Sequence, residues 1–315
     1  MVDLVYQLFP YAIAFTIPLL LTSLGGLFSE RSGVINIGLE GLMLMGMFVG
    51  AYTINRMEIA NPGMAVWYGL MAAVIFGALF ALLHAFACVT LNANQVISGI
   101  AINMIASAVT VYLARFLTGS GNVQIIRGVS RVTIPILSDV PVVGRLFFTQ
   151  TYATTWLVLA ILAIATFVLY KTRFGLRLRA CGEQPHAADS AGVNVYVMRY
   201  MAVIISGACA GLGGAIFIVT LSGEFNGTAA GLGFLALAAL IFGQWKPWGI
   251  LGATFFFGFA STIANLSQVI PALSQIPGIY LKTFPYVITL LALVLSSRSS
   301  QAPKAIGEVY DKGKR

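Results

Sequence analysis

Residues 200–221 read YMAVIISGACAGLGGAIFIVTL, a stretch without a single charged side chain. An α-helix of about 20 apolar residues is long enough to cross roughly 30 Å of hydrocarbon. Similar runs recur along the whole chain, and the backbone polar groups of a segment in lipid must be satisfied within the structure. Transmembrane barrel strands would be about ten residues long with strict alternation. The pattern therefore predicts an all-α, polytopic bundle of transmembrane helices.

The composition excludes a soluble globular domain. The chain has 315 residues, of which 59% are hydrophobic and 9% charged, and its mean hydropathy is +0.91. A soluble domain carries about 25% charged residues because its surface faces water, so this exterior faces lipid. The net charge of +8 is spread between apolar runs, which favours topology and anionic headgroups over nucleic-acid binding. Cys88, Cys181 and Cys209 lack CxxC spacing, and we interpret them as packing residues.

The apolar runs predict about nine spans within one transmembrane domain that covers residues 1–315. No basic segment precedes the first run, so we expect a retained helix and not a removed signal peptide. The seventh run is short enough for a broken or re-entrant helix. A polar loop occupies residues 171–199, and the tail at 297–315 is hydrophilic. The predicted spans are residues 9–28, 34–54, 64–91, 96–117, 152–170, 200–221, 229–242, 249–269 and 280–296.

The distribution of Lys and Arg predicts the orientation, because cytoplasmic loops carry an excess of these residues. With nine spans and the tail inside, 12 of the 18 basic residues lie on the inner side. We therefore expect the N-terminus outside, and the C-terminus and the 171–199 loop in the cytoplasm. The six basic residues on the outer side are Arg56, Arg115, Arg127, Arg131, Arg145 and Lys282.

The loop at 171–199 is long for a connection inside a helix bundle, where most connections are short. Within it, Pro185 suits the first position of a helix, and Gly192 suits the position just after its end. The residues between them, from His186 to Ala191, are good helix formers. They predict a short helix outside the membrane that acts as a docking element; a merely solvated loop with a basic topological signal is the alternative.

This loop resembles that of a known transporter family. The spacing His186-Ala187-Ala188-x3-Gly192 is similar to the EAA loop, by which permeases of ATP-binding-cassette importers engage their ATPase subunits. The stretch 179–194, RACGEQPHAADSAGVN, resembles that loop in branched-chain amino acid, ribose and nucleoside permeases, with His186 where a glutamate is usual. The resemblance implies that coupling to the ATPase involves Arg179, Gly182, Glu183, Pro185, His186, Ala187, Ala188 and Gly192.

Three further segments resemble the nucleoside and simple-sugar branch of this family: GVINIGLEG at 33–41, NANQVISGIAIN at 92–103 and GQWKPWG at 243–249. The resemblance implies a pair of permease subunits, often two different chains, in a bacterial plasma membrane. Two ATPase subunits and an extracellular binding protein or lipoprotein complete such an importer. The sequence contains no GxxxxGK[ST] P-loop, so we expect no catalytic residue, cofactor or metal on this chain, and ATP and Mg²⁺ on the partner ATPase.

Polar residues at membrane depth are candidates for the transport pathway, because such residues are costly in lipid and usually face a cavity or a partner. We interpret Glu40, early in the second run, as either a helix-terminus contact or a cavity residue. His84 lies alone in an apolar run and is interpreted as a packing residue. For the amides and hydroxyls, hydrogen bonds between helices are the alternative to lining the pathway. The candidate pathway residues are Asn36, Glu40, Ser98, Asn103, Glu224 and Asn226.

The resulting hypothesis is a permease subunit that moves nucleosides by alternating access, driven by a separate ATPase that acts on residues 185–192. Simple sugars and branched-chain amino acids are the alternative substrates within the same family. An ion-coupled secondary transporter would need several intramembrane carboxylates or matched repeats, whereas Glu40 is nearly alone. A membrane-embedded enzyme would need clustered His, Asp or Glu on facing helices, and the two histidines are far apart in the sequence.

Overall fold

The computed structural model describes residues 2–135, 138, 140–142, 144–266, 280, 283–284, 287 and 301–313. Over these residues the protein is a bundle of α-helices with four strands of two residues each, which confirms the predicted all-α class. A π-helical turn, η1 (Phe86–Thr90), extends α3, and another, η3 (Ile218–Ser222), extends α8. The α-helices are α1 (Val2–Arg31), α2 (Leu39–Ala60), α3 (Ala65–Ala85), α4 (Gln95–Thr118), α5 (Ala153–Lys171), α6 (Arg173–Glu183), α7 (Pro185–Ser190), α8 (Val195–Phe217), α9 (Leu232–Phe242) and α10 (Pro247–Leu266).

In the described part of the chain, six helices are long and apolar enough to cross a membrane. They are Leu8–Arg31, Ala65–Thr90, Gln95–Thr118, Ala153–Lys171, Val195–Ser222 and Pro247–Asn265. Helix α2 occupies most of the predicted second span, and α9 is a short apolar helix of 11 residues at the predicted short run. The predicted span at 280–296 falls almost entirely outside the described residues.

The second predicted span differs from the structure at its beginning. The sequence pattern places its start at Val34, whereas α2 begins at Leu39. The backbone of Gly33 has a φ of +93°, which ends α1 and turns the chain. Asn36 then accepts a hydrogen bond from the Gly38 N–H at 3.1 Å, and this local bond competes with helix formation. Hydropathy alone does not register such a turn, because the residues on both sides are apolar.

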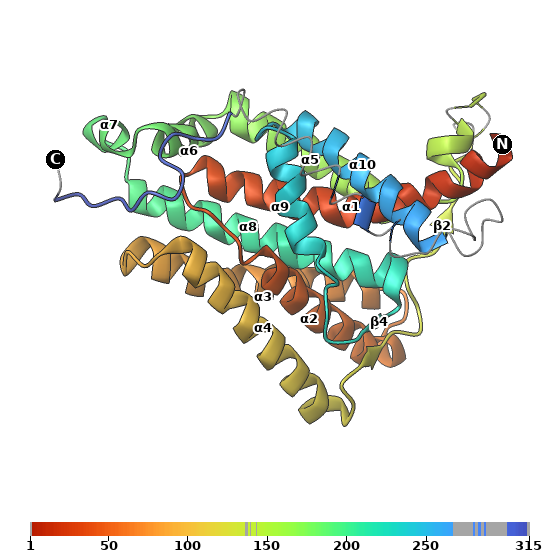
Figure 1. Cartoon of the computed structure of the whole chain (residues 1–315). Helices are drawn as coiled ribbons and strands as arrows, with labels where there is room; N and C mark the ends of the chain where they lie inside the picture. The colour runs from red at the N-terminus through yellow and green to blue at the C-terminus, as the bar shows by residue number, and fades with distance from the viewer. Residues whose placement is uncertain are drawn as a thin grey trace.

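Helix α8 lies at the centre of the bundle, packed against α1, α2 and α3. A Cβ atom at Gly211 would collide with the backbone of Ala73 in α3, and one at Gly214 with the backbone of Met43 in α2. These glycines permit the close helix approach that the Gly207-xxx-Gly211 spacing indicates. The span of α8 is 72% buried, compared with 28% for α4, which leans away from the other helices (Figure 1).

The two ends of the bundle are built differently (Figure 1). At one end lie α6, α7 and the C-terminal segment 301–313, and at the other lie the N-terminus and two small β-pairs. Strand β1 (Val123–Gln124) pairs antiparallel with β4 (Glu224–Phe225), and β2 (Arg131–Val132) pairs antiparallel with β3 (Thr151–Tyr152). The β1–β4 pair connects the long segment between α4 and α5 to the chain that follows α8, and the β2–β3 pair closes a loop within that segment.

Candidate functional site

The docking element expected in the polar loop is a helix, α7, between α6 and α8. Pro185 occupies its first turn, where the missing N–H removes no helical hydrogen bond. The chain then turns at Gly192, whose φ of +81° lies in the left-handed region, and the Gly192 N–H donates to the Asp189 carbonyl at 2.8 Å. Ala188 is buried, whereas His186 and Ala187 are exposed. Helix α7 therefore presents a small exposed face at one end of the bundle.

The end of α6 is held against the end of α1. Gly182 lies so close to the Arg31 backbone that a Cβ atom would collide with it. The Arg31 guanidinium lies 3.9 Å from the Glu183 carboxylate and donates to the Trp245 carbonyl at 2.7 Å. The Trp245 indole in turn donates to the Glu30 carboxylate at 2.6 Å. These contacts tie the end of α6, which α7 directly follows, to α1 and to the connection between α9 and α10.

Two further side chains of α6, Arg179 and Cys181, pack inward. The Arg179 guanidinium lies 5.1 Å from the centre of the Tyr170 ring of α5. Cys181 is fully buried, and burial raises the pKa of its thiol to about 11. The expected coupling residues therefore fall into two groups: one group holds α7 in position, and the other group is exposed. The positioning set is Arg179, Gly182, Glu183, Pro185 and Ala188, and the exposed set is His186, Ala187 and Gly192.

The C-terminal tail packs across this loop. The N–H of Ala305 donates to the Gly182 carbonyl at 2.9 Å, and the buried ring of Tyr310 lies 5.2 Å from the His186 ring. The sequence predicted a hydrophilic tail and gave no partner for it. An isolated tyrosine within a polar tail was the one available signal.

Two of the candidate pathway amides bond neighbouring segments. Asn36 donates to the Ser206 hydroxyl of α8 at 2.9 Å. Asn103 of α4 accepts from the Gly41 N–H at 2.7 Å and donates to the Ile37 carbonyl at 3.0 Å. These bonds join the start of α2 to α4 and α8, and they match the interhelical alternative considered for these residues.

Ser98 is bonded to the buried histidine. Its hydroxyl lies 2.9 Å from His84 Nδ1, while His84 Nε2 lies 3.0 Å from the Ile35 carbonyl. His84 has no exposed surface, and both of its ring nitrogens have partners. It is therefore a satisfied packing residue that joins α3, the start of α4 and the segment before α2.

The two carboxylates among the candidates fix the connection between η3 and α9. Glu40 of α2 accepts hydrogen bonds from the N–H groups of Gly231 and Gly233, at 2.9 Å and 2.6 Å. Glu224 belongs to β4, and its carboxylate lies 3.5 Å from the side-chain amide of Gln124 in β1. Both ends of this connection are thereby anchored to neighbouring elements.

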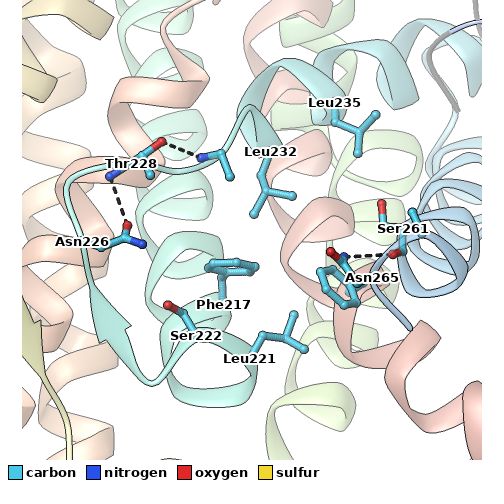
Figure 2. Close-up of a pocket in the computed structure, with 12 residues that line it drawn as sticks. Phe217, Leu221, Ser222, Asn226, Thr228, Leu232, Leu235, Ser261 and Asn265 are labelled. Atoms are coloured by element: carbon cyan, nitrogen blue, oxygen red, sulfur yellow. Dashed lines mark hydrogen bonds between the residues drawn. The ribbon is translucent and has the colours of Figure 1, made fainter. Parts of the chain in front are cut away.

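A cavity of about 580 Å³ lies beside this connection. Asn226 and Thr228 form one side of it, and Ser261 and Asn265 of α10 form the opposite side (Figure 2). Of the candidate pathway residues, Asn226 lines this cavity and the other five do not. The spacing of Ser261 and Asn265, one helical turn apart in an apolar run, was a sequence signal for this face. The remaining lining residues are Phe15, Phe217, Leu221, Ser222, Ala230, Leu232, Leu235 and Ala264.

Comparison with known proteins identifies the family. Residues 9–293 match the family described as branched-chain amino acid transport system / permease component. The chain belongs to this permease family. The match and the apolar helices together establish a multi-pass membrane protein, as the sequence predicted.

Permeases of nucleoside transporters are among its relatives. The chain is 45% identical to the guanosine ABC transporter permease protein NupQ of Bacillus subtilis, over 97% of both chains. It is 41% identical to the nucleoside ABC transporter permease protein NupC of Lactococcus lactis, over 96% of both chains. It is also 28% identical to a second guanosine ABC transporter permease protein of Bacillus subtilis, NupP, over 76% of this chain and 69% of NupP.

Proposed function

We propose that this chain is the membrane-spanning permease subunit of an ABC importer for nucleosides. The observation that carries the proposal is its end-to-end similarity to two permeases named for guanosine and nucleoside transport. A cavity with polar groups on two sides near one end of the bundle and an exposed short helix at the other end are the parts that such a role needs. ATP and Mg²⁺ bind to separate ATPase subunits in this proposal, and no covalent chemistry occurs on this chain.

Helix α8 is the proposed mechanical link between the two ends. It begins at Val195, three residues after Gly192, and ends at Phe217, which lines the cavity. A helix of 23 residues is about 35 Å long at 1.5 Å per residue. Because an intact helix moves as a unit, a displacement of α7 by the ATPase reaches the cavity wall. This provides a physical route for alternating access.

The proposed orientation places α7 and the C-terminus in the cytoplasm and the N-terminus outside. The basic residues of α6, including Arg173, Arg177 and Arg179, support it through the positive-inside rule. The partners proposed are a second permease chain, two ATPase subunits and an extracellular binding protein or lipoprotein. The similarity of the chain to both NupQ and NupP supports the pairing of two different permeases.

Uptake into vesicles tests the proposed function. The complete transporter, reconstituted with its partner permease, ATPase and binding protein, should accumulate radiolabelled guanosine only when ATP is supplied to the ATPase. Unlabelled nucleosides should compete, whereas ribose and leucine should not. Uptake driven by a proton or sodium gradient without ATP contradicts an ABC mechanism, and preferential uptake of ribose or leucine contradicts the substrate class.

A matched pair of variants tests the docking role of α7. Ala187→Trp adds bulk to the exposed face of α7 and should reduce co-purification of the ATPase with the permease. Ala60→Trp adds the same bulk at an exposed position at the end of α2 and should leave co-purification unchanged. Equal recovery of the ATPase with both variants contradicts the docking role.

A further inference from the structure

The cavity beside α9 has polar groups on two opposing sides. On α10, Ser261 and Asn265 are four residues apart, so they share one helix face. Figure 2 shows both of them across the cavity from Asn226. The Oδ1 atom of Asn226 accepts from the Thr228 N–H at 3.4 Å, which leaves its amide NH₂ group directed to other partners.

This arrangement calls for a polar occupant. An amide without hydrogen-bond partners is costly to place in an apolar environment. The Asn265 amide donates to the Ser261 carbonyl at 2.9 Å, and an amide has a second N–H and an oxygen as well. Asn226 and Asn265 are both exposed and line the same space, in a chain whose exterior faces lipid. Water or a polar ligand in the cavity would therefore supply hydrogen-bond partners for these two amides.

The floor between the two polar sides is aromatic and apolar. Phe217 and Leu221 lie between Asn226 and Asn265 in Figure 2. Leu221 and Ser222 belong to the π-helical turn η3, which Phe217 directly precedes. Turns of this kind occur frequently at functional sites, and here the turn ends α8 at the cavity. A planar base stacks favourably on an aromatic ring of this kind.

The cavity also discriminates by charge. None of its lining residues in the described part of the chain is Asp, Glu, Lys, Arg or His. A zwitterionic amino acid or a nucleotide phosphate would lose its hydration there without a counter-ion, which is very costly. A neutral ligand with several hydrogen-bonding groups pays no such penalty, and the volume of about 580 Å³ lies within the range of roughly 300–1,000 Å³ typical of small-molecule sites.

We propose that this cavity is a nucleoside-binding chamber, in which the base stacks on Phe217 and the amides of Asn226 and Asn265 bond the base edge and the ribose. An amide group both donates and accepts, so it can bond either part of the ligand. The inference rests on the proposed function and adds a substrate site to it. Because Phe217 is joined to α7 through α8, motion of the coupling helix acts directly on the bound ligand.

Substitutions at Phe217 test the chamber in the complete transporter. At saturating binding protein, Phe217→Leu should lower ATP-driven guanosine uptake roughly tenfold, because 1.4 kcal/mol of lost stacking corresponds to a factor of ten. Phe217→Tyr keeps the ring and should retain uptake within about twofold on the same scale. Phe76→Leu on α3, where Phe76 is 49% exposed, is the matched control and should behave as wild type.

A second variant separates this inference from the proposed function. Asn265→Leu removes an amide from the opposite side and should also reduce guanosine uptake, at unchanged amounts of permease in the membrane. Wild-type uptake by both Phe217→Leu and Asn265→Leu overturns the chamber while the importer function stands. Absence of ATP-driven nucleoside uptake by the wild-type transporter overturns both.

An independent observation concerns the C-terminal tail at the other end of the bundle. The Ala305 N–H donates to the Gly182 carbonyl of α6 at 2.9 Å, and the Gly307 N–H donates to the Gly33 carbonyl at 3.0 Å. The tail thus forms backbone bonds to the two segments that meet at the end of α1, and both bonds are independent of side-chain identity.

Side chains of α7 and α8 contact Glu308 and Tyr310 of the tail. Arg199 of α8 is 1% exposed and donates from Nη1 to the Glu308 carbonyl at 2.9 Å. Loss of this partner would leave a buried guanidinium less satisfied, which is costly. The Tyr310 ring packs against the rings of His186 and Tyr196, with centroid distances of 5.2 Å and 5.3 Å. Tyr310 therefore lies between the coupling helix and the start of α8.

We infer that residues 301–313 are a strap that holds α7 in the position from which it engages the ATPase, with Tyr310 as the positioning residue. Lys312 lies 3.8 Å from Asp189 of α7 and adds a second attachment. The strap and α7 together form one surface, so a force on α7 is transmitted to α8 through Tyr310 as well as along the chain.

Variants of Tyr310 test the strap. Tyr310→Ala should reduce ATP-driven uptake and ATPase co-purification at least fivefold, at equal amounts of permease in the membrane. Tyr310→Phe retains the ring contacts and should behave as wild type. If Tyr310→Ala accumulates poorly, Tyr310→Leu fills the same space without the ring and should show the same loss. Wild-type uptake by whichever of Tyr310→Ala and Tyr310→Leu accumulates normally overturns the inference.

A cysteine pair distinguishes positioning from general stability. Asp189→Cys and Lys312→Cys, introduced together into Tyr310→Ala and joined by a bis-maleimide crosslinker whose spacer contains a disulfide, should restore uptake by re-attaching the tail to α7. Dithiothreitol, which cleaves the spacer, should abolish the rescue. Failure of the crosslinked pair to restore uptake, once the crosslink is verified, also overturns the strap.

Discussion

The carboxylate of Glu40 accepts a hydrogen bond from the Gly233 N–H at 2.6 Å, which joins α2 to the first turn of α9. A second bond, from Gly231, completes the contact. The N-terminus of a helix carries unpaired N–H groups and a partial positive charge, so a carboxylate stabilises it. Leu232 and Leu235 of the same helix line the cavity. Glu40 therefore fixes a cavity wall without lining the cavity itself.

Removal of this carboxylate should loosen α9. Glu40→Ala leaves two N–H groups without their acceptor and should lower the free energy of unfolding by about 1–3 kcal/mol. Glu40→Gln keeps one acceptor oxygen and should cost less. Thermal unfolding of the purified permease in detergent measures both. Glu224→Gln, on nearby β4, is the control and should have little effect, because glutamine keeps an oxygen for the 3.5 Å contact with Gln124. An unfolding temperature of Glu40→Ala equal to that of the wild type contradicts the capping role.

The glycine face of α8 gives a second prediction. Gly214→Ala places a Cβ atom against the Met43 backbone and should destabilise the bundle by about 1–3 kcal/mol through overpacking. Gly252→Ala on α10 is the matched control, because none of the described residues lies within 4 Å of the added atom. Alanine is favoured over glycine in a helix by about 1 kcal/mol, so this control should be neutral or stabilising. Equal unfolding temperatures for the two variants contradict the packing argument.

The sequence predicted the features that local patterns determine. Apolar runs of sufficient length located the helices, and Pro185 with Gly192 located α7, because each signal depends on neighbouring residues alone. The same patterns missed the turn before α2. There the Gly33 backbone conformation and the Asn36 side chain interrupt a run that hydropathy treats as continuous.

Local sequence patterns do not predict contacts between residues that are distant in the sequence. The six candidate pathway residues share one property, a polar group at membrane depth, and residues that only pack helices together share it too. Asn103 is bonded to the start of α2, while Asn226 faces the cavity, and only the fold separates them. The contact of Tyr310 with His186 joins residues 124 positions apart, the difference between their numbers, and the polar tail gave no periodicity from which to infer it.

The reactivity of the buried Cys181 thiol tests how tightly α6 packs against its neighbours. Burial raises its pKa to about 11, so the neutral form, which reacts poorly, prevails below that pH and the thiolate appears only as the pH approaches it. In a variant without Cys88 and Cys209, maleimide should label Cys181 negligibly between about pH 7 and 9 until the protein is denatured. Adding Ala187→Cys, an exposed position, should give rapid labelling. Fast labelling of Cys181 at pH 8 contradicts the packing of α6.

The way in which α7 ends should depend on the backbone conformation of Gly192. Its φ of +81° lies in the left-handed region, and no atom of the part of the chain that the structure describes lies within 4 Å of an added Cβ atom, so a substitution acts through conformation and not through a clash. Gly192→Val should cost at least about 1–2 kcal/mol in that conformation and should weaken co-purification of the ATPase. Gly192→Asn tolerates the conformation better and should retain more ATPase. Because both side chains fit the same open space, equal recovery with the two variants would show that ATPase engagement does not depend on how α7 ends.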